Sequence, residues 1–189
     1  MVSMRNLALA ASTIVGFTSA APTMEARTTE TYTPGTLNNT QEFYIKMSVT
    51  SGDTSFNNKY LEAYHTGAGL ADPTFTNETD ARVPSFLNGT SLQFDVGDFP
   101  FSPNAYLGDS NYARWEPVTI GTGYSTGWVN NATAGGLVVQ DEAFAGWIVC
   151  EWYHGVNAPQ LFALITGYAT DLDDIPSSCA LVNLVPEFF

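Results

Sequence analysis

Short stretches in which apolar and polar residues alternate, separated by glycine and proline, constrain this chain more than any other feature. Between Phe43 and Val49 every second residue is apolar, which is the period of a strand buried on one face. The chain has 16 glycines and 10 prolines, residue types that interrupt strands and form turns. Further strands are expected at Lys59–Thr66, Ser91–Val96, Arg114–Ile120, Gly127–Asn130, Gly136–Gln140, Gly146–His154, Gln160–Thr166 and Ala180–Val185. Leu70–Thr90 is expected to be irregular, with room for one helical turn.

This spacing of short strands predicts an all-β fold: a single antiparallel sandwich or barrel of about eight to ten strands, with little helix. The strand Gly146–His154 carries large apolar groups on both faces. We therefore expect it to be central and covered on both sides. On this interpretation, truncating Trp152 to Ala would cost about 3–5 kcal/mol.

The N-terminal residues predict export. Arg5 precedes an apolar stretch from Leu7 to Phe17, and small residues follow up to Ala20. This is the order of a signal peptide, and the apolar stretch is shorter than the roughly 20 residues that cross a bilayer. We expect a signal peptide at 1–20, a leader or disordered spacer at 21–41, and a single β domain at 42–189, secreted without a membrane anchor.

The formal net charge of −13 comes from 19 acidic and 6 basic residues, and the basic residues form no cluster. Nucleic-acid binding needs clustered cations that displace counterions from phosphates, so we expect no nucleic-acid partner. A strongly negative surface favours solubility, and we expect a monomer.

The two cysteines, Cys150 and Cys179, predict one disulfide, because a single pair in an exported protein is most simply bonded. The loop that this bond would close implies roughly 3.5 kcal/mol of stabilisation by the chain-entropy estimate. The alternative, a catalytic thiol at Cys150 near His154, leaves Cys179 unexplained.

Four Asn-x-Ser/Thr sequons, none with proline in the middle, lie in stretches expected to be loops. They are at Asn38, Asn77, Asn88 and Asn131. We expect two or more of them to carry glycan.

Glu151 is the carboxylate whose neighbours most suggest chemistry, because aromatic and aliphatic residues share its face. Such surroundings could raise the pKa of Glu151 and make it a general acid, with Asp141, Glu142 or Glu116 as the second carboxylate. The simpler interpretation places Glu151 at a strand edge in contact with water, and that is what we expect.

The only histidines, His65 and His154, each lie beside an aromatic residue and close to a glycine. Two histidines and a carboxylate could hold zinc or copper, but their spacing matches no metal signature. We expect structural histidines and no metal or cofactor.

Most aromatic residues of a β domain fill its core, although exposed tryptophan and tyrosine can stack on sugars or contact proteins. Trp128, in a glycine-flanked segment beside Asn130 and Asn131, is the tryptophan we expect at the surface. The candidate ligand-binding residues are therefore Trp128, Glu151, Tyr153, His154 and His65.

Six segments of the chain carry a further signal: Tyr64–Asp72, Phe86–Thr90, Gln93–Gly97, Tyr112–Ile120, Gly146–Gly155 and Pro176–Cys179. Together they resemble a family of small secreted proteins from filamentous ascomycetes. The family is a domain of unknown function, and some relatives are named IgE-binding protein, a label that describes an antibody response. The resemblance implies no catalytic residues.

These observations favour a secreted, non-enzymatic protein of the effector-like or allergen-like class that binds a glycan or a protein at the fungal wall, the matrix or the host interface. One alternative is a small acid-active glycoside hydrolase with paired carboxylates. Another is a structural component of the wall or matrix.

The first testable prediction concerns processing. When a eukaryotic host secretes the protein, the mature chain should begin near Ala21, and enzymatic removal of N-glycans should lower its apparent mass. N-terminal sequencing and gel mobility measure both. A secreted protein that keeps Met1, or whose mass does not change, would contradict this prediction.

Overall fold

The computed structural model describes residues 41–96, 100–108, 114–155, 157–166 and 175–189. The expected signal peptide, the spacer and the sequon at Asn38 lie outside the described residues. In the described part the chain forms strands and three-residue 3-10 turns and no α-helix, which confirms the all-β prediction.

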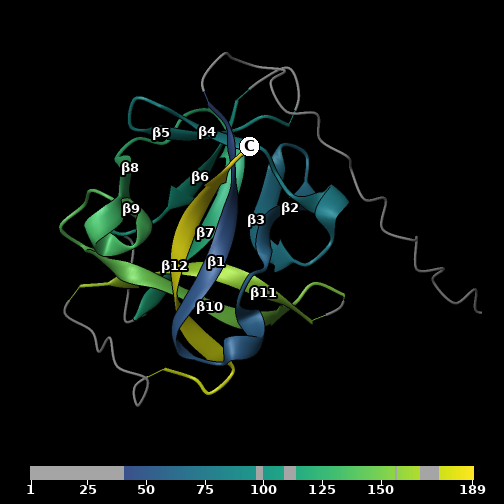
Figure 1. Ribbon diagram of the computed structural model, residues 1–189, viewed down its shortest axis with the longest axis vertical. Coiled ribbons are helices and arrows are strands. Elements are labelled where there is room, and N and C mark those ends of the chain that lie inside the picture. Colours follow the sequence, from purple (N-terminus) through teal and green to yellow (C-terminus); the bar gives the residue numbers. More distant parts are fainter. Residues whose placement is uncertain (1–40, 97–99, 109–113, 156, 167–174) are drawn as a thin grey trace, which may run out of the picture.

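Ten strands form one antiparallel sheet, and this sheet contains a closed nine-stranded antiparallel barrel (Figure 1). In chain order they are β1 (Phe43–Gly52), β2 (Tyr60–Gly67), β3 (Leu70–Thr76), β4 (Ser85–Asn88), β5 (Ser91–Phe94), β6 (Phe101–Ala105), β7 (Trp115–Thr122), β10 (Phe144–Tyr153), β11 (Asn157–Ile165) and β12 (Cys179–Phe188). A separate two-stranded ribbon consists of β8 (Trp128–Asn131) and β9 (Gly136–Val139). The 3-10 turns are η1 (Thr54–Phe56), η2 (Thr79–Ala81) and η3 (Ala132–Ala134).

The first and last strands of the barrel are paired along almost their whole length. The register of β1 and β12 runs from Phe43 opposite Phe188 to Gly52 opposite Ala180, with a bulge between Val49 and Ser51. Alternate side chains of β1, at Phe43, Ile45 and Met47, point into the barrel and are at most 2% exposed. The apolar residues of the period-two pattern therefore form part of the inner face of the barrel wall.

The disulfide between Cys150 and Cys179 is present, as predicted. These cysteines lie directly opposite each other in the pairing of β10 with β12, with Cα atoms 4.0 Å apart. They belong to a second apolar cluster outside the barrel wall, together with Ile148, Phe162 and Leu164. The bond thus joins the last strand to β10 in an apolar layer on the outer face.

The prediction that Leu70–Thr90 is irregular is wrong, because β3 and β4 lie there; the single helical turn of the stretch is η2. Pro73 lacks a backbone N–H and interrupts the sequence pattern. It is tolerated because β3 pairs with β7 only at Leu70 and Ala71 and with β11 only at Thr74. At Pro73 neither β7 nor β11 pairs with β3, so no backbone carbonyl of those strands is left without a donor by the missing N–H.

The prediction that Gly146–His154 is covered on both faces holds for half of that strand. Trp147, Ile148, Val149 and Cys150 are at most 5% exposed. The residues from Glu151 to Tyr153 are exposed, because the hairpin formed by β10 and β11 extends past the rest of the barrel.

Trp128 is buried, with 2% exposure, so its placement at the surface was wrong. The ribbon folds back on the barrel, and the indole rings of Trp128 and Trp147 stack with centroids 5.2 Å apart. Trp147 also donates a hydrogen bond from Nε1 to the carbonyl oxygen of Leu137, over 2.7 Å. The indole of Trp147 therefore connects the ribbon to the barrel, through ring stacking and a hydrogen bond.

Trp147→Ala should lower the free energy of unfolding by about 3–5 kcal/mol, because it removes a buried ring and a satisfied hydrogen bond. Trp152 is 54% exposed, so Trp152→Ala should cost less than about 1 kcal/mol. This replaces the larger cost that the sequence suggested for Trp152. Urea denaturation of both variants measures the difference, and equal costs would contradict this description of the core.

Candidate functional site

The tip of the β10–β11 hairpin brings together three of the residues singled out from the sequence: Glu151, Tyr153 and His154. The hairpin reaches the side of the molecule where β2 and β3 lie (Figure 1). The hydroxyl group of Tyr64 in β2 donates a hydrogen bond of 2.6 Å to the carbonyl oxygen of His154. The tip is therefore fastened to the barrel wall at a defined place.

The His154 side chain is the centre of this attachment and is only 7% exposed. Its Nε2 donates a hydrogen bond of 2.9 Å to Oε1 of Gln160, and its ring packs on Tyr64 with centroids 4.7 Å apart. Its Nδ1 lies 3.7 Å from Oδ2 of Asp72, within ion-pair distance but too far for a hydrogen bond. Both ring nitrogens thus face protein groups, which fits the structural role expected for this histidine.

His65 lies apart from His154, because Tyr64 and His65 point to opposite faces of β2. His65 is exposed and lines a small cavity of about 170 Å³ with Phe94, Phe101 and Ile120. In the described ranges no group of three or more His, Cys, Asp or Glu side chains could hold a metal ion.

Glu151 is exposed, and the partners considered for a catalytic pair lie far from it. Asp141 and Glu142 precede β10, whose length puts them more than roughly 20 Å from Glu151 at ~3.3 Å per residue. Glu116 is opposite Ala163, which is opposite Trp147, so it is about 16 Å from Glu151 by the same spacings. Paired glycosidase carboxylates lie about 5–10 Å apart.

Trp152 was expected to be buried, whereas Tyr153 was a candidate for ligand binding. In the structure both side chains are exposed, Trp152 by 54% and Tyr153 by 73%. Trp152 lies on the outer face of β10, where its ring meets that of Phe162 edge to face with centroids 5.6 Å apart. Its cross-strand neighbour is Ala158, a side chain too small to cover an indole. The apolar run in the sequence predicted a strand buried along its whole length. It does not indicate that the last residues of β10 lie beyond the elements that bury the first ones.

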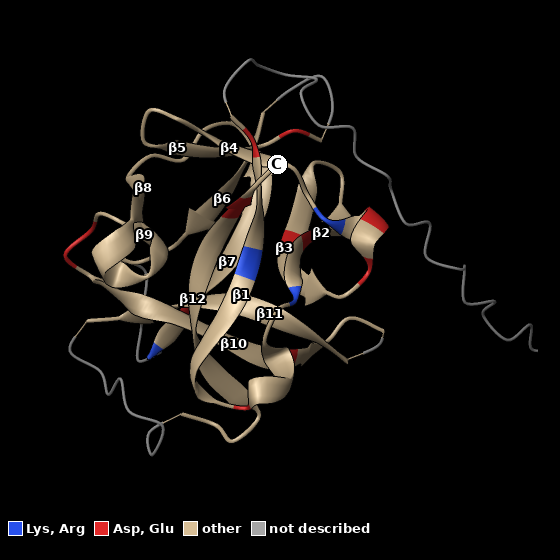
Figure 2. Ribbon diagram, in the orientation of Figure 1, with Lys and Arg blue, Asp and Glu red and all other residues tan. Residues whose placement is uncertain are grey.

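The described part of the chain has few basic residues. Figure 2 marks Lys and Arg at a few positions along the ribbon, and two of them, Lys46 and Arg82, contact the same Tyr60 ring. No helix in the described part of the chain has the length and apolar character needed to span a membrane.

The three remaining sequons are in accessible positions. Asn77, Asn88 and Asn131 are all exposed, each at or just beyond the end of a strand. The Asn131 side chain also caps η3, accepting hydrogen bonds at Oδ1 from the backbone N–H groups of Thr133 and Ala134. Its Nδ2, the atom that would carry glycan, takes no part in that cap. Glycosylation stays a prediction.

These features define a disulfide-bonded, closed antiparallel β-barrel with a docked ribbon and an aromatic hairpin tip. Residues 40–188 match the family model described as Domain of unknown function (DUF7907), and the chain belongs to that family. Neither the search of curated proteins nor the search of solved structures found a match.

Asp72 makes the stability of this attachment depend on pH. Burial raises the pKa of Asp72, and the charge of His154 offsets part of that shift. Because the folded-state pKa is raised, the contribution of Asp72 to stability is full below its ordinary pKa and is lost as pH rises through the raised value. Asp72→Asn should therefore stabilise the protein at about pH 8 and not at about pH 3.

Thermal melts of Asp72→Asn at both pH values measure this effect. Asp80→Asn, a change at an exposed position on η2, controls for the loss of one negative charge and should stay within about 0.5 kcal/mol of wild type. A gain for Asp72→Asn no larger than that of the control would contradict the assignment.

Proposed function

We propose that this protein is a secreted, non-enzymatic binding protein and that a glycan stacks on Trp152 at the tip of the β10–β11 hairpin. The observation that carries the proposal is the exposure of Trp152, 54%, on a strand whose preceding residues are buried. Although one side of the Trp152 indole packs on Phe162, more than half of its surface is left in water, where a ligand can cover it. Aromatic faces of this kind bind the apolar faces of sugar rings.

The geometry around Trp152 favours a fixed platform. The edge-to-face contact with Phe162, itself 5% exposed, holds the indole from one side. The attachment of His154 to Tyr64 and Gln160 fixes the backbone two residues further on. A ring fixed before binding loses little conformational entropy when a ligand arrives.

The positions of the carboxylates support binding without hydrolysis. The register separates Glu151 from Asp141, Glu142 and Glu116 by more than the distance over which two carboxylates act on one glycosidic bond. A glycan bound at Trp152 would therefore lie near Glu151, but none of these three carboxylates would be close enough to form a catalytic pair with Glu151.

Secretion and a fungal source complete the proposal. The predicted signal peptide, the disulfide and the exposed sequons support export. The resemblance to secreted proteins of filamentous ascomycetes supports the fungal wall, the matrix or the host interface as the place of action. Wall polysaccharides are then the first ligands to test.

The test combines a glycan array with calorimetric titration of chitin and β-1,3-glucan oligosaccharides, alongside hydrolysis assays on the same sugars. Trp152→Ala should weaken binding of the sugar that wild type binds by at least about tenfold, because it removes the stacking surface. Tyr124→Ala, which removes a ring that is 68% exposed elsewhere, is the matched control and should bind as wild type does.

Three results would count against the proposal. Binding that survives Trp152→Ala would place the site elsewhere. Release of shorter sugars by wild type, abolished by Glu151→Gln, would favour the hydrolase alternative. Failure to bind any sugar on the array would leave a protein partner or a structural role in the wall as the better account.

A further inference from the structure

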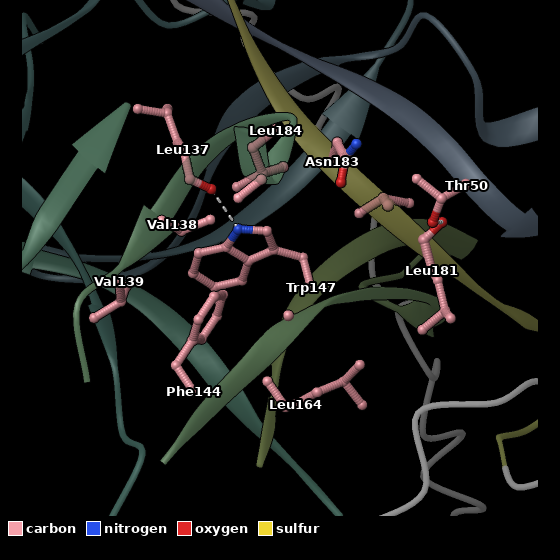
Figure 3. A pocket seen from close by; sticks show the side chains of 14 residues that line it. Thr50, Leu137, Val138, Val139, Phe144, Trp147, Leu164, Leu181, Asn183 and Leu184 are labelled. Carbon is pink, nitrogen blue, oxygen red and sulfur yellow. Dashed lines mark hydrogen bonds between the residues drawn. The ribbon is translucent and has the colours of Figure 1, made fainter. Parts of the chain in front are cut away.

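A cleft of about 400 Å³ lies where the ribbon meets the barrel, between β9 on one side and β10 and β12 on the other. Figure 3 shows the Trp147 side chain in the middle of it, with Leu137, Val138 and Val139 on one side and Asn183 on the other. Its volume is in the range of pockets that take small molecules. Trp152 is not among the residues that line it.

The cleft is pre-formed, because the ribbon is docked by close backbone contact. Gly135 and Gly136 have φ values of 85° and 147°, in the region that favours glycine. A Cβ atom on Gly136 would overlap the carbonyl oxygen of Leu184, and one on Gly135 would overlap the Asn183 side chain. Together with the stack of Trp128 on Trp147, these contacts keep the walls in place.

The lining selects against charge. Among the described residues that line the cleft there is no Asp, Glu, Lys, Arg or His, so an ionic ligand would find no counter-charge on these walls. With a net charge of −13, the protein would also repel an anion. A neutral molecule with both apolar and polar surface is the occupant that these walls fit, because the exposed lining is polar and apolar in similar measure.

Three described residues bring polar side-chain groups to the cleft: Thr50, Trp147 and Asn183. The hydroxyl group of Thr50 donates to the carbonyl oxygen of Leu181 over 3.1 Å, and the indole N–H of Trp147 donates to Leu137. In contrast, the side-chain amide of Asn183 makes no hydrogen bond within the described part of the chain, and it lies on the wall of the cleft. It can donate to or accept from a ligand.

We propose that this cleft is a binding site for a small neutral ligand with an apolar ring or chain and a hydroxyl or carbonyl group that meets the Asn183 amide. The site is separate from the one proposed for glycan, and neither depends on the other. Trp147 forms its floor, so ligand binding should change tryptophan fluorescence.

The experiment uses the secreted protein and the neutral fluorescent probe N-phenyl-1-naphthylamine, with the anionic probe 8-anilinonaphthalene-1-sulfonate for comparison. The neutral probe should bind saturably, with one site per chain, and at least about tenfold more tightly than the anionic probe. Absence of saturable binding by the neutral probe, or equal binding of both, would overturn the proposal.

Two exposed alanines of η3 provide a matched pair of variants, since Ala134 lines the cleft and Ala132 does not. Ala134→Trp should fill the opening and weaken probe binding by at least about tenfold, whereas Ala132→Trp should leave it unchanged. Near-ultraviolet circular dichroism checks that both variants are folded. Equal effects of the two, or no effect of Ala134→Trp, would place the probe elsewhere, for example in the cavity beside His65.

Asn183→Leu tests the polar contact. On wild type, 1-naphthol should displace the probe at least about tenfold better than naphthalene does, because only the alcohol can bond to the amide. Asn183→Leu should remove that preference while naphthalene still competes. A preference that persists in the variant would show that Asn183 does not orient the ligand.

Discussion

The antiparallel pairing of β1 with β12 is the constraint on which the rest of the structure depends. It joins the two ends of the domain, from Phe43 opposite Phe188 to Gly52 opposite Ala180. Without it the barrel would have two long open edges, which strands of this kind expose only at the risk of aggregation. Because β12 also pairs with β10 and is bonded to it through Cys150 and Cys179, closing the barrel fixes β10 as well. Both proposed sites depend on that strand.

The two sites use β10 in different ways. At Trp147 the strand is covered on both faces, and the cleft exists because the ribbon docks there with glycines instead of side chains. At Trp152 the strand has passed the barrel, and its outward side chain has only Phe162 for support. The same apolar run thus supplies the floor of a cleft and an exposed ring. Which role each residue takes depends on what covers it.

That dependence explains how much the sequence could predict. The period-two pattern at Phe43–Val49 and the cysteine pair are local or nearly unambiguous signals, and both were confirmed. Trp128 and Trp152 were assigned the wrong way round, because their burial depends on where the ribbon and the hairpin fold back. The strand β3 was missed because Pro73 interrupts its sequence pattern. The contact of His154 with Asp72 joins residues far apart in the chain, so no pattern within one segment predicts it.

The central claim, binding at the hairpin tip without turnover, is tested most directly by nuclear magnetic resonance of the indole N–H groups. The chain has 4 tryptophans, and only Trp152 is both half exposed and at the tip. On addition of a chitin or β-1,3-glucan oligosaccharide that binds, the Trp152 signal should move while those of the buried Trp128 and Trp147 stay in place, and the anomeric signals of the sugar should remain unchanged for days. Movement of the Trp128 and Trp147 signals alone, or new reducing-end signals from the sugar, would contradict the account.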